Sequence, residues 1–380
     1  MVIELHILKL IDFPSKSLLT YADENFFSYF LGATNILPLS KELIKMGHKI
    51  TIFTGGRSKY PSYENIEGIN VYRTILPRRG YYLPYSFGLI PVYKKIIKKH
   101  GPIDIIHAHS FKNAYGYSFI KPFIKKPLVV SHHSVSHPNY VDLSPIEKVL
   151  LVNNLTKAID RLIVLPITRD HYNEFIKLGI DKDIIRTVSI GVNPNQFKKK
   201  RDTEKIILSP NRLVKWKNTE TFLQAARMVL QNYNDYRFVI LGDGPEKQNL
   251  VNLAKKIGIS ENVDFVGIVN PKDIVNYYSR AYVTVSPMKI ESFGKVILES
   301  LSCNTPVIST DYGVPKDIKG CGIYGSKSDD IEFFADAMIN LIKNKKLREQ
   351  LGSKGRKIII KKYQWKMIAK ELLKVYEEIT

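Results

Sequence analysis

Residues 282–300, YVTVSPMKIESFGKVILES, predict a strand, a loop and a helix in that order. The run that ends at Ser286 is apolar and β-branched, as in a buried strand, and the part after Gly294 has helical character. Glu291 is then expected in a loop at the carboxyl edge of a sheet. Glu299 is expected about one and a half turns into the helix. A carboxylate beside an apolar core is costly unless something pairs with it, so these two carboxylates are candidates for binding a ligand.

The loop between the two glutamates adds hydrogen-bond donors. Backbone N–H groups of the SFG stretch lie at a helix N-terminus, which favours anions, and Gly294 lets a ligand approach the backbone closely. Lys295 adds a cation in the first turn. Donors for a phosphate that are flanked by acceptor carboxylates suit a ligand with hydroxyl groups, such as a ribose and a hexose. The alternative interpretation is that the glutamates are ordinary charges near a helix start.

Strands and helices alternate along the rest of the chain, which predicts parallel sheets covered by helices. The expected fold class is α/β, with two Rossmann-like, doubly wound parallel-sheet domains that face each other across a cleft. The segment Pro194–Asp202 is polar and aperiodic, so we place the hinge there. The predicted domains are residues 1–194 and 203–360, and a last helix, 361–380, follows with no strand after it.

Composition limits the class of protein. At 380 residues, two domains are the natural expectation, and no apolar stretch is long enough to span a bilayer. The N-terminus lacks the cationic start of a signal peptide, and Cys303 and Cys321 have no disulfide or metal-ligand spacing. These features favour a cytoplasmic protein. The net charge of +21 indicates phosphate-bearing partners: nucleic acid, an anionic membrane face or a phosphorylated substrate.

Much of the positive charge lies in the first domain. Between Arg73 and Lys126, Asp104 is the one acidic residue beside eleven Lys and Arg. Within residues 78–101 aromatic side chains alternate with these cations, a composition that suits a lipid headgroup interface. The same pattern also fits a solvated helix face, Lys94–Lys99, beside core aromatics, and both interpretations stay open. The aromatic residues are Tyr81, Tyr82, Tyr85, Phe87 and Tyr93.

Two further cations are expected at a sheet edge. Arg212 and Lys217 follow the predicted strand KIILSP, in the connection to the next helix. An arginine fork and a lysine point charge together suit a diphosphate, although two solvated loop cations would show the same pattern. Gly242 and Gly244 end another strand, and we interpret them as residues of a tight turn rather than as ligand contacts.

In this order, the motifs NRLVKWKN, LGDGP, VDFVG, SPMKIESFGKVILES and TPVISTDYG resemble the retaining glycosyltransferases of family 4, which have the GT-B fold. The resemblance covers most of the second domain and is looser in the first. It also implies that the last helix, 361–380, crosses back to the first domain. It implies that Arg212 and Lys217 bind the diphosphate of a nucleotide sugar, that Glu299 accepts ribose hydroxyls and that Glu291 accepts hexose hydroxyls. It implies catalytic roles for His133, Glu291, Arg212 and Lys217. The implied donor-binding residues are Gly32, Arg212, Lys217, Glu291, Phe293, Gly294, Lys295 and Glu299.

The chain departs from the family pattern at several points. Asn218 and Asn304 replace glycines, the glycine-rich loop is reduced to Gly32, and Pro166-Ile167-Thr168 replaces the usual strand end. His132 is a rival to His133. His107 and His109 share a strand face, where His107 is expected to be packed and His109 to line the cleft. Asp181-Lys182-Asp183 is a DxD sequence away from any sheet edge, so we interpret it as a surface turn and expect no essential divalent metal or other cofactor.

The expected activity is transfer of a hexose from a nucleotide-diphosphate sugar to a hydroxyl acceptor with retained configuration. The basic first domain indicates a lipid-linked or membrane-associated glycan as acceptor, and an enzyme attached to the cytoplasmic face of a membrane. The alternatives are a soluble acceptor, as in sucrose, trehalose or glucan synthases, a basic nucleic-acid-binding protein, and a non-catalytic member of the fold. No nucleic-acid recognition motif is present, so no nucleic-acid partner is expected. The sequence predicts no oligomeric state.

Overall fold

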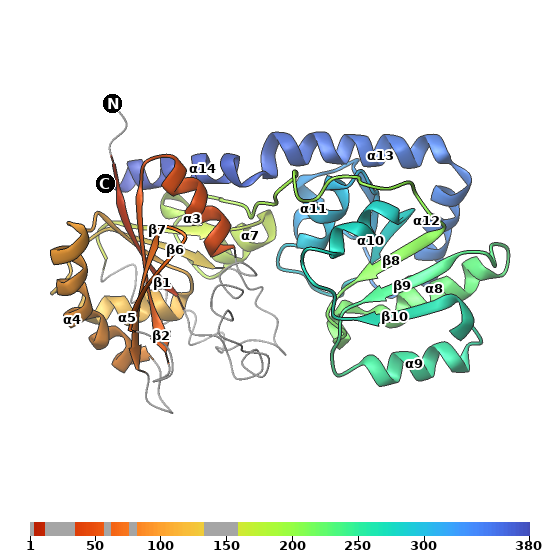
Figure 1. The fold of residues 1–380 in the computed structure, drawn as a ribbon, viewed down its shortest axis with the longest axis horizontal. Helices are drawn as coiled ribbons and strands as arrows, with labels where there is room; N and C mark the ends of the chain where they lie inside the picture. Colours follow the sequence, from red (N-terminus) through yellow and green to blue (C-terminus); the bar gives the residue numbers. More distant parts are fainter. Residues whose placement is uncertain (1–3, 12–34, 57–61, 76–81, 133–158) are drawn as a thin grey trace. The chain divides into compact units, whose positions relative to one another are not determined.

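The computed structural model describes residues 4–11, 35–56, 62–75, 82–132 and 159–380 (Figure 1). The chain divides into two compact units. Unit 1 contains residues 1–167, 171–191 and 365–380, and unit 2 contains residues 168–170 and 192–364. The chain therefore passes from unit 1 to unit 2 at residues 191–192, just before the predicted hinge, and its last helix belongs to unit 1 from Trp365 onward.

Unit 1 contains a seven-stranded sheet in its described residues, in the order β3-β4-β2-β1-β5-β6-β7. All neighbouring strands are parallel except β3 and β4, which form an antiparallel hairpin. The sequence pattern did not predict this hairpin, because β3 has four partly exposed residues and no apolar alternation. The strands are β1 (His6–Ile11), β2 (Lys49–Gly56), β3 (Tyr63–Ile66), β4 (Ile69–Ile75), β5 (Ile105–Ala108), β6 (Leu128–His132) and β7 (Leu162–Pro166).

Helices cover both faces of this sheet. One apolar core lies under α4 and α5, and a second lies under α3 and α14. The predicted helix around Leu39 and Leu43 is α3, and Gly47 with a φ of 94° follows its end as expected for a C-terminal glycine. The helices are α3 (Ile36–Lys45), α4 (Tyr82–His100), α5 (Phe111–Ile120), α7 (Arg169–Lys177), the short η1 (Lys182–Ile184) and α14 (Trp365–Ile379).

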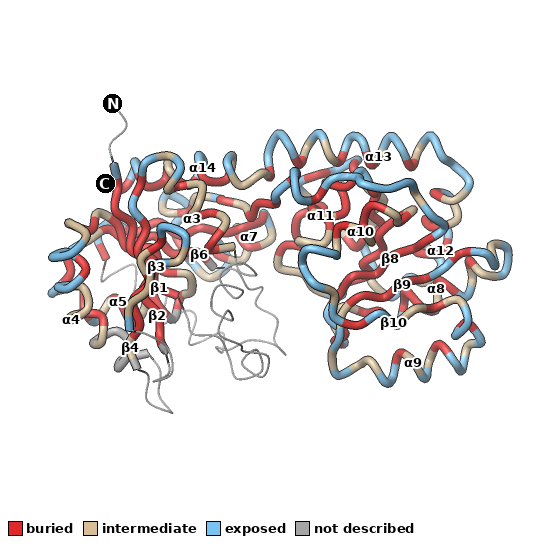
Figure 2. Tube along the Cα trace, viewed as in Figure 1, coloured by how far each residue is buried: buried red, intermediate tan, exposed pale blue. Residues whose placement is uncertain are grey.

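Unit 2 contains a six-stranded sheet in the order β10-β9-β8-β11-β12-β13, and every pair is parallel. Figure 2 shows β8 and β9 as mainly buried and the helices as buried along one side. The parallel α/β class predicted from the alternating pattern is confirmed in both units. The strands are β8 (Ile206–Pro210), β9 (Arg237–Leu241), β10 (Val263–Gly267), β11 (Val283–Ser286), β12 (Val307–Thr310) and β13 (Gly322–Gly325).

The helices of unit 2 follow its strands in sequence, and α8 and α12 pack against each other over one core. The α-helices are α8 (Thr219–Leu230), α9 (Lys247–Lys256), α10 (Ile274–Arg280), α11 (Lys295–Ser302), α12 (Ile331–Lys343) and α13 (Lys345–Ile358). The shorter turns are η2 (Lys215–Lys217), η3 (Ser260–Asn262), η4 (Val314–Asp317) and the π-helical η5 (Ile359–Tyr363).

The two asparagines that replace family glycines have a common explanation. Asn218 has a φ of 53° and Asn304 has a φ of 59°, so both lie in the left-handed region. Glycine adopts this conformation most easily, and among the other residues asparagine is one of those that tolerate it best. The two substitutions therefore preserve the backbone path that the glycines provide.

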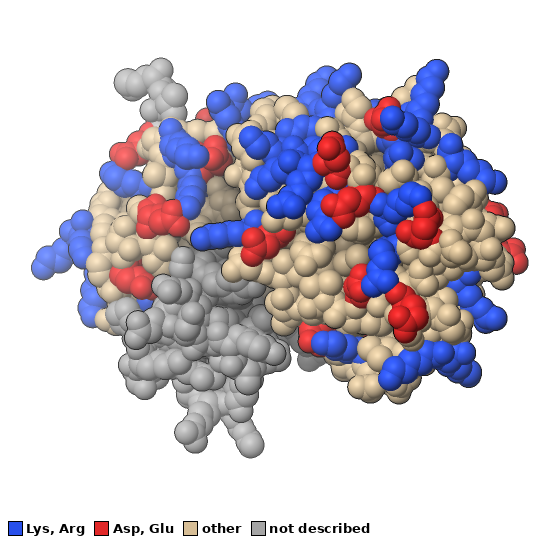
Figure 3. Space-filling view, turned by 45° about the vertical axis from the view of Figure 1, so that its right-hand side comes forward, with Lys and Arg blue, Asp and Glu red and all other residues tan. Residues whose placement is uncertain are grey.

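Charged residues are spread over the surface. On the face shown in Figure 3, Lys and Arg side chains lie over many elements, with Asp and Glu side chains between them. No helix in the described part of the chain is long and apolar enough to cross a membrane.

Candidate functional site

The carboxyl edge of the unit 2 sheet brings together segments that are far apart in sequence. Strands β8 and β11 are neighbours, so the residues after Pro210 lie beside those after Ser286. The side chains confirm this proximity, because the Ser286 hydroxyl donates to the amide oxygen of the buried Asn211 at 3.3 Å. The two segments that the sequence singled out as cationic and acidic thus meet at one edge.

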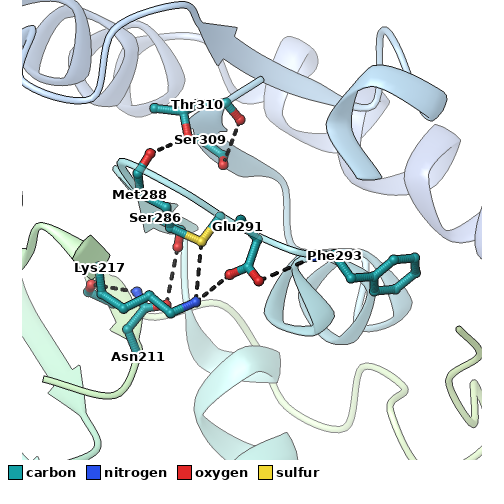
Figure 4. Close-up of polar contacts among 9 residues, drawn as sticks. Asn211, Lys217, Ser286, Met288, Glu291, Phe293, Ser309 and Thr310 are labelled. Carbon is teal, nitrogen blue, oxygen red and sulfur yellow. Dashed lines mark hydrogen bonds and ion pairs between the residues drawn. The ribbon is translucent and has the colours of Figure 1, made fainter. Parts of the chain in front are cut away.

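Lys217 and Glu291 form an ion pair at this edge. Their side chains are 18% and 13% exposed, so solvent screens the pair less than it would a surface pair. Figure 4 shows the Lys217 ammonium directed at the Glu291 carboxylate and at the sulfur of Met288, which lies 3.5 Å away. The other carboxylate oxygen of Glu291 accepts from the N–H of Phe293 at 3.3 Å. Glu291 is therefore fixed by one cation and one backbone donor.

Backbone and side-chain hydrogen bonds fix the loop that carries Glu291. The Thr310 hydroxyl donates to the carbonyl of Met288 at 2.8 Å, and Lys289 N–H donates to the carbonyl of Trp216 at 2.8 Å. Gly294 ends the loop with a φ of 93°, which favours glycine, and α11 begins at the next residue. The sequence therefore needs glycine here for a sharp entry into the helix.

Arg212 lies in the connection after β8 and is exposed. Its side chain makes no hydrogen bond or ion pair with the other described residues. Its backbone segment is closely packed, because a Cβ atom at Gly242 would lie 2.2 Å from the carbonyl of Asn211, and one at Gly244 would lie 2.3 Å from that of Leu213. The two glycines are structural, as the sequence indicated, and they determine where Arg212 is presented.

Glu299, on α11, is half-buried, and its carboxylate has one hydrogen-bond partner among the described residues. The hydroxyl of the fully buried Tyr278 donates to Oε2 of Glu299 at 2.8 Å. Among the described residues nothing hydrogen-bonds to Oε1, which stays available as an acceptor. Burial raises the pKa of Glu299, while Lys295 on the same helix and the Tyr278 hydroxyl oppose the rise. The site therefore offers one oriented carboxylate with an open oxygen.

The remaining predicted site residues have different outcomes. Phe293 is buried, and its N–H already bonds to Glu291, whereas Lys295 is half-buried at the first position of α11. Gly32 and His133 lie outside the described residues, as does the side chain of His132. Their proposed roles stay predictions.

The other histidine and acidic motifs belong to unit 1. His107 in unit 1 is buried, as expected, between the hydroxyls of Tyr376 and Ser131. The DxD sequence is an exposed turn, in which the Asp181 carboxylate accepts from the N–H of Asp183 at 3.0 Å. Among the residues that the structure describes, no group of three or more His, Cys, Asp or Glu is arranged to bind a metal ion.

Comparison with protein families identifies the chain. The family model described as glycosyl transferases group 1 matches residues 193–358, and the model described as Glycosyltransferase Family 4 matches residues 33–196. Together these models cover residues 33–358. The chain belongs to glycosyltransferase family 4. The resemblance inferred from the motifs is confirmed, and Arg212, Lys217, Glu291 and Glu299 all lie within the group 1 match.

Related proteins in this family include enzymes with different named activities. The glycosyltransferase is 26% identical over 363 residues to an uncharacterised glycosyltransferase of Methanocaldococcus jannaschii, covering 89% of this chain and 92% of that one. It is 28% identical over 306 residues to the alpha-monoglucosyldiacylglycerol synthase of Streptococcus pneumoniae, covering 73% of this chain and 67% of that one.

Solved structures show the same fold. A sucrose-phosphate synthase from Thermosynechococcus elongatus matches with a TM-score of 0.75 at 19% identity, and the match covers 99% of both chains. An Anabaena protein solved in complex with UDP and glucose matches with a TM-score of 0.74 at 14% identity, covering 98% of this chain and all of that one. The glycosyltransferase therefore has the predicted GT-B fold.

Sequence reasoning missed two residues at this edge. Tyr278 lies within the aromatic-rich segment 274–282, where its hydroxyl gives no signal that distinguishes it from a core aromatic residue. Met288 contacts Lys217 through its sulfur and also provides the carbonyl that Thr310 binds. Only the three-dimensional pairing of α10 with α11 and of β11 with β12 reveals these contacts.

Proposed function

We propose that this glycosyltransferase moves a hexose from a nucleotide-diphosphate sugar to a hydroxyl acceptor, with retention of configuration. The observation that carries the proposal is the juxtaposition at one sheet edge of Arg212, Lys217 and Glu291, close in sequence to the half-buried Glu299 with its open oxygen. Cations for a diphosphate and carboxylates for sugar hydroxyls are the chemistry that such a donor requires.

The proposed mechanism assigns one task to each group. Arg212 and Lys217 stabilise the charge that grows on the leaving diphosphate, and preorganised cations of this kind supply a large part of catalysis in many enzymes. Glu299 accepts the ribose hydroxyls through its open oxygen. Glu291, which Lys217 and the Phe293 N–H orient, accepts hexose hydroxyls and places the anomeric carbon near the acceptor.

No residue is assigned as a dedicated base. In front-face transfer, the C–O bond to the diphosphate breaks while the acceptor oxygen bonds to the anomeric carbon on the same face. The acceptor proton then passes to an oxygen of the departing diphosphate. His133 is proposed to face the donor sugar, Gly32 to border the donor, and the backbone of Gly294 and Lys295 to contact it. No divalent ion is assigned to this step.

The proposed acceptor is a lipid-linked or membrane-associated glycan. The Streptococcus relative is named for synthesis of a glycolipid, which supports this acceptor class. On α4, Lys94, Lys95, Lys98 and Lys99 are exposed, whereas Tyr93 packs against the unit 1 core. These exposed lysines are proposed to attach the enzyme to the cytoplasmic membrane face. The enzyme is expected to sediment with anionic vesicles at low salt and to be released at about 0.5 M salt, because salt screens the attraction between the lysines and the lipid headgroups. No sedimentation at low salt would contradict the proposed membrane attachment.

A second candidate is transfer to a soluble sugar. The likeness of fold to the sucrose-phosphate synthase favours this alternative. Assays with lipid acceptors in vesicles and with soluble sugars or sugar phosphates, run with the same donor, distinguish the two. Product formed only with the soluble acceptors would replace the lipid-linked proposal.

A thermal-shift panel of UDP-, GDP-, ADP- and dTDP-glucose tests the donor proposal. A ligand that binds only the folded state raises the apparent unfolding temperature, so one base is expected to give the largest shift. Glu299→Ala is expected to abolish that shift. Glu261→Ala is the matched control, because Glu261 precedes β10 at the amino edge of the same sheet.

Two further measurements complete the test. The anomeric configuration of the product, read by nuclear magnetic resonance, is expected to match that of the donor. Turnover is expected to be unchanged after treatment with a chelator. An inverted product would contradict the retaining mechanism, and activity restored by a divalent cation would contradict the metal-independent one.

A further inference from the structure

The Tyr278–Glu299 contact has a geometry that an ordinary core tyrosine does not need. Tyr278 is fully buried on α10, and its hydroxyl would be costly in the core without a hydrogen-bond partner. The partner is a carboxylate oxygen at 2.8 Å, on the next helix along the chain. Burial and the adjacent carboxylate raise the pKa of Tyr278 well above its ordinary value, so the hydroxyl stays protonated and donates.

The tyrosine itself is held from several sides. The Thr305 hydroxyl donates to the Tyr278 carbonyl at 2.6 Å, and the ring of Phe197 packs edge-on with centroids 6.1 Å apart. The neighbouring Ser279 is also anchored, since its hydroxyl donates to the carbonyl of Lys198 at 3.2 Å. Tyr278 is therefore a fixed point from which Glu299 is oriented.

We infer that Tyr278 is a positioning residue for the donor: its hydroxyl occupies one oxygen of Glu299 and directs the other toward the sugar hydroxyls of the nucleotide. This inference rests on the proposed function. A glutamate that is free to rotate loses side-chain entropy when it binds a ligand, and a carboxylate already held by Tyr278 has lost that freedom in advance. Tyr278 also stabilises the charged form of the acceptor that the ligand needs.

The direction of the pH effect follows from these contacts. Removing the Tyr278 hydroxyl removes one of the two influences that oppose the rise in the pKa of Glu299. Protonation of Glu299 then begins at a higher pH, and donor binding is lost at a higher pH as the solution is acidified. The other titratable groups described near Glu299 are Lys295 on its own helix, Cys303 at the end of that helix, and Arg356 on α13 and Lys200, which both act on Cys303.

The test is the substitution Tyr278→Phe in the full-length protein. The probe is whichever of UDP, GDP, ADP and dTDP stabilises the wild type most, and its dissociation constant is measured by calorimetry from pH 5 to pH 8. We expect affinity to fall about tenfold at pH 7, because a hydrogen bond to a charged group is lost. We also expect the pH at which binding is half lost to move upward, an effect that a purely structural role for Tyr278 would not produce.

Tyr376→Phe is the matched control. Tyr376 is also fully buried, and its hydroxyl bonds to His107 in unit 1, so the same atom is removed from an equally buried site in the other unit. Its affinity and pH profile are expected to match the wild type. In a Glu299→Ala background, Tyr278→Phe should cause no further loss, because the group that it positions is absent.

The outcomes separate this inference from the proposed function. If Glu299→Ala weakens binding but Tyr278→Phe behaves like Tyr376→Phe in both affinity and pH profile, the positioning role is wrong and the donor site stands. If neither Glu299→Ala nor Arg212→Ala changes the affinity, both the donor site and the positioning role are wrong. If Tyr278→Phe unfolds at a lower temperature, binding is measured below that temperature. The pH at which the folded variant loses half of its binding then still decides whether Tyr278 positions Glu299.

Discussion

One group of buried polar side chains in unit 1 is paired within the protein itself. Under α3 and α14, the ammonium of Lys9 donates to the Ser40 hydroxyl at 2.9 Å. Nearby on the adjacent strand, His107 lies between the hydroxyl of Tyr376, 2.6 Å from Nδ1, and that of Ser131, 2.7 Å from Nε2. All of these residues are buried.

The carboxyl edge of the unit 2 sheet differs in this respect. Arg212 is exposed, Lys217 and Glu291 are partly exposed, and Glu299 has one oxygen without a partner among the described residues. The difference separates polar residues that hold the fold together from polar residues that are available to a ligand. We therefore expect the glutamates in the unit 2 loop and helix, and not the packed His107 in unit 1, to contact a ligand.

The largest expected effect concerns the buried, paired polar side chains of unit 1, and Lys9 in particular. Burial lowers the pKa of Lys9 to about 7, so the folded state binds fewer protons than the unfolded chain between pH 7 and pH 10.5. Stability therefore rises with pH across this window, and the full penalty is present below pH 7. Lys9→Met is expected to raise the free energy of unfolding of unit 1 by on the order of 4 kcal/mol at pH 6 and by little at pH 10.

Denaturant unfolding at the two pH values measures this effect. A Trp216→Phe background leaves Trp365, in unit 1, as the fluorescent reporter. Ser40→Ala is a useful companion, because it removes the hydrogen-bond acceptor of the Lys9 ammonium and should destabilise the unit more at pH 6, where the ammonium is retained, than at pH 10. An equal change at pH 6 and pH 10 for Lys9→Met would mean that protonation of Lys9 is not the cause. Donor affinity should be unaffected by Lys9→Met.

The next largest effect concerns the polar side chains at the carboxyl edge of the unit 2 sheet. Lys217→Ala is expected to lower turnover by roughly 100-fold or more, since a cation at the leaving group is lost. It also leaves the Glu291 carboxylate without its cation, which is expected to destabilise unit 2 by about 2 kcal/mol. Lys205→Ala is the control, because Lys205 is an exposed, ion-paired lysine directly before β8 at the opposite edge of the sheet. Equal turnover in both variants would remove Lys217 from the mechanism.

The smallest expected effects concern the two left-handed asparagines. The side chain of Asn218 donates to the Thr221 hydroxyl at 2.9 Å and to the Ser328 carbonyl at 2.6 Å, so Asn218→Gly should cost about 1 kcal/mol. Asn304 has no side-chain hydrogen bond among the described contacts, and Asn304→Gly should be within about 0.5 kcal/mol of the wild type. Thermal unfolding of both variants measures the difference in stability. A larger loss of stability for Asn304→Gly than for Asn218→Gly would show that Asn304 contributes more than a left-handed backbone conformation.

These contrasts indicate how far the sequence could lead. The alternation of strands and helices is local, so it predicted both parallel sheets, and the motifs around Glu291 and Glu299 predicted the family. The hairpin of β3 and β4 and the short β13 were missed, because short strands with polar residues or glycines carry little pattern. Tyr278 could not be predicted, because its role depends on which helix lies beside α10, and that is a tertiary fact.

The prediction that Arg212 and Lys217 bind one diphosphate rested on their positive charges and on their closeness in the connection after β8. The structure adds that Lys217 already has a carboxylate partner while Arg212 does not. Spacing alone could not distinguish these two states, since it does not report which side chains meet across neighbouring strands. A bound diphosphate is therefore expected to meet Arg212 first and to share Lys217 with Glu291.

Titration of a nucleoside diphosphate against two arginine variants tests the central claim most directly. Arg212 follows β8 at the carboxyl edge, whereas Arg237 begins β9 at the amino edge and pairs with Asp264. The account predicts that Arg212→Ala weakens binding at least tenfold and that Arg237→Ala binds as the wild type does. Equal dissociation constants for the wild type and Arg212→Ala would contradict it.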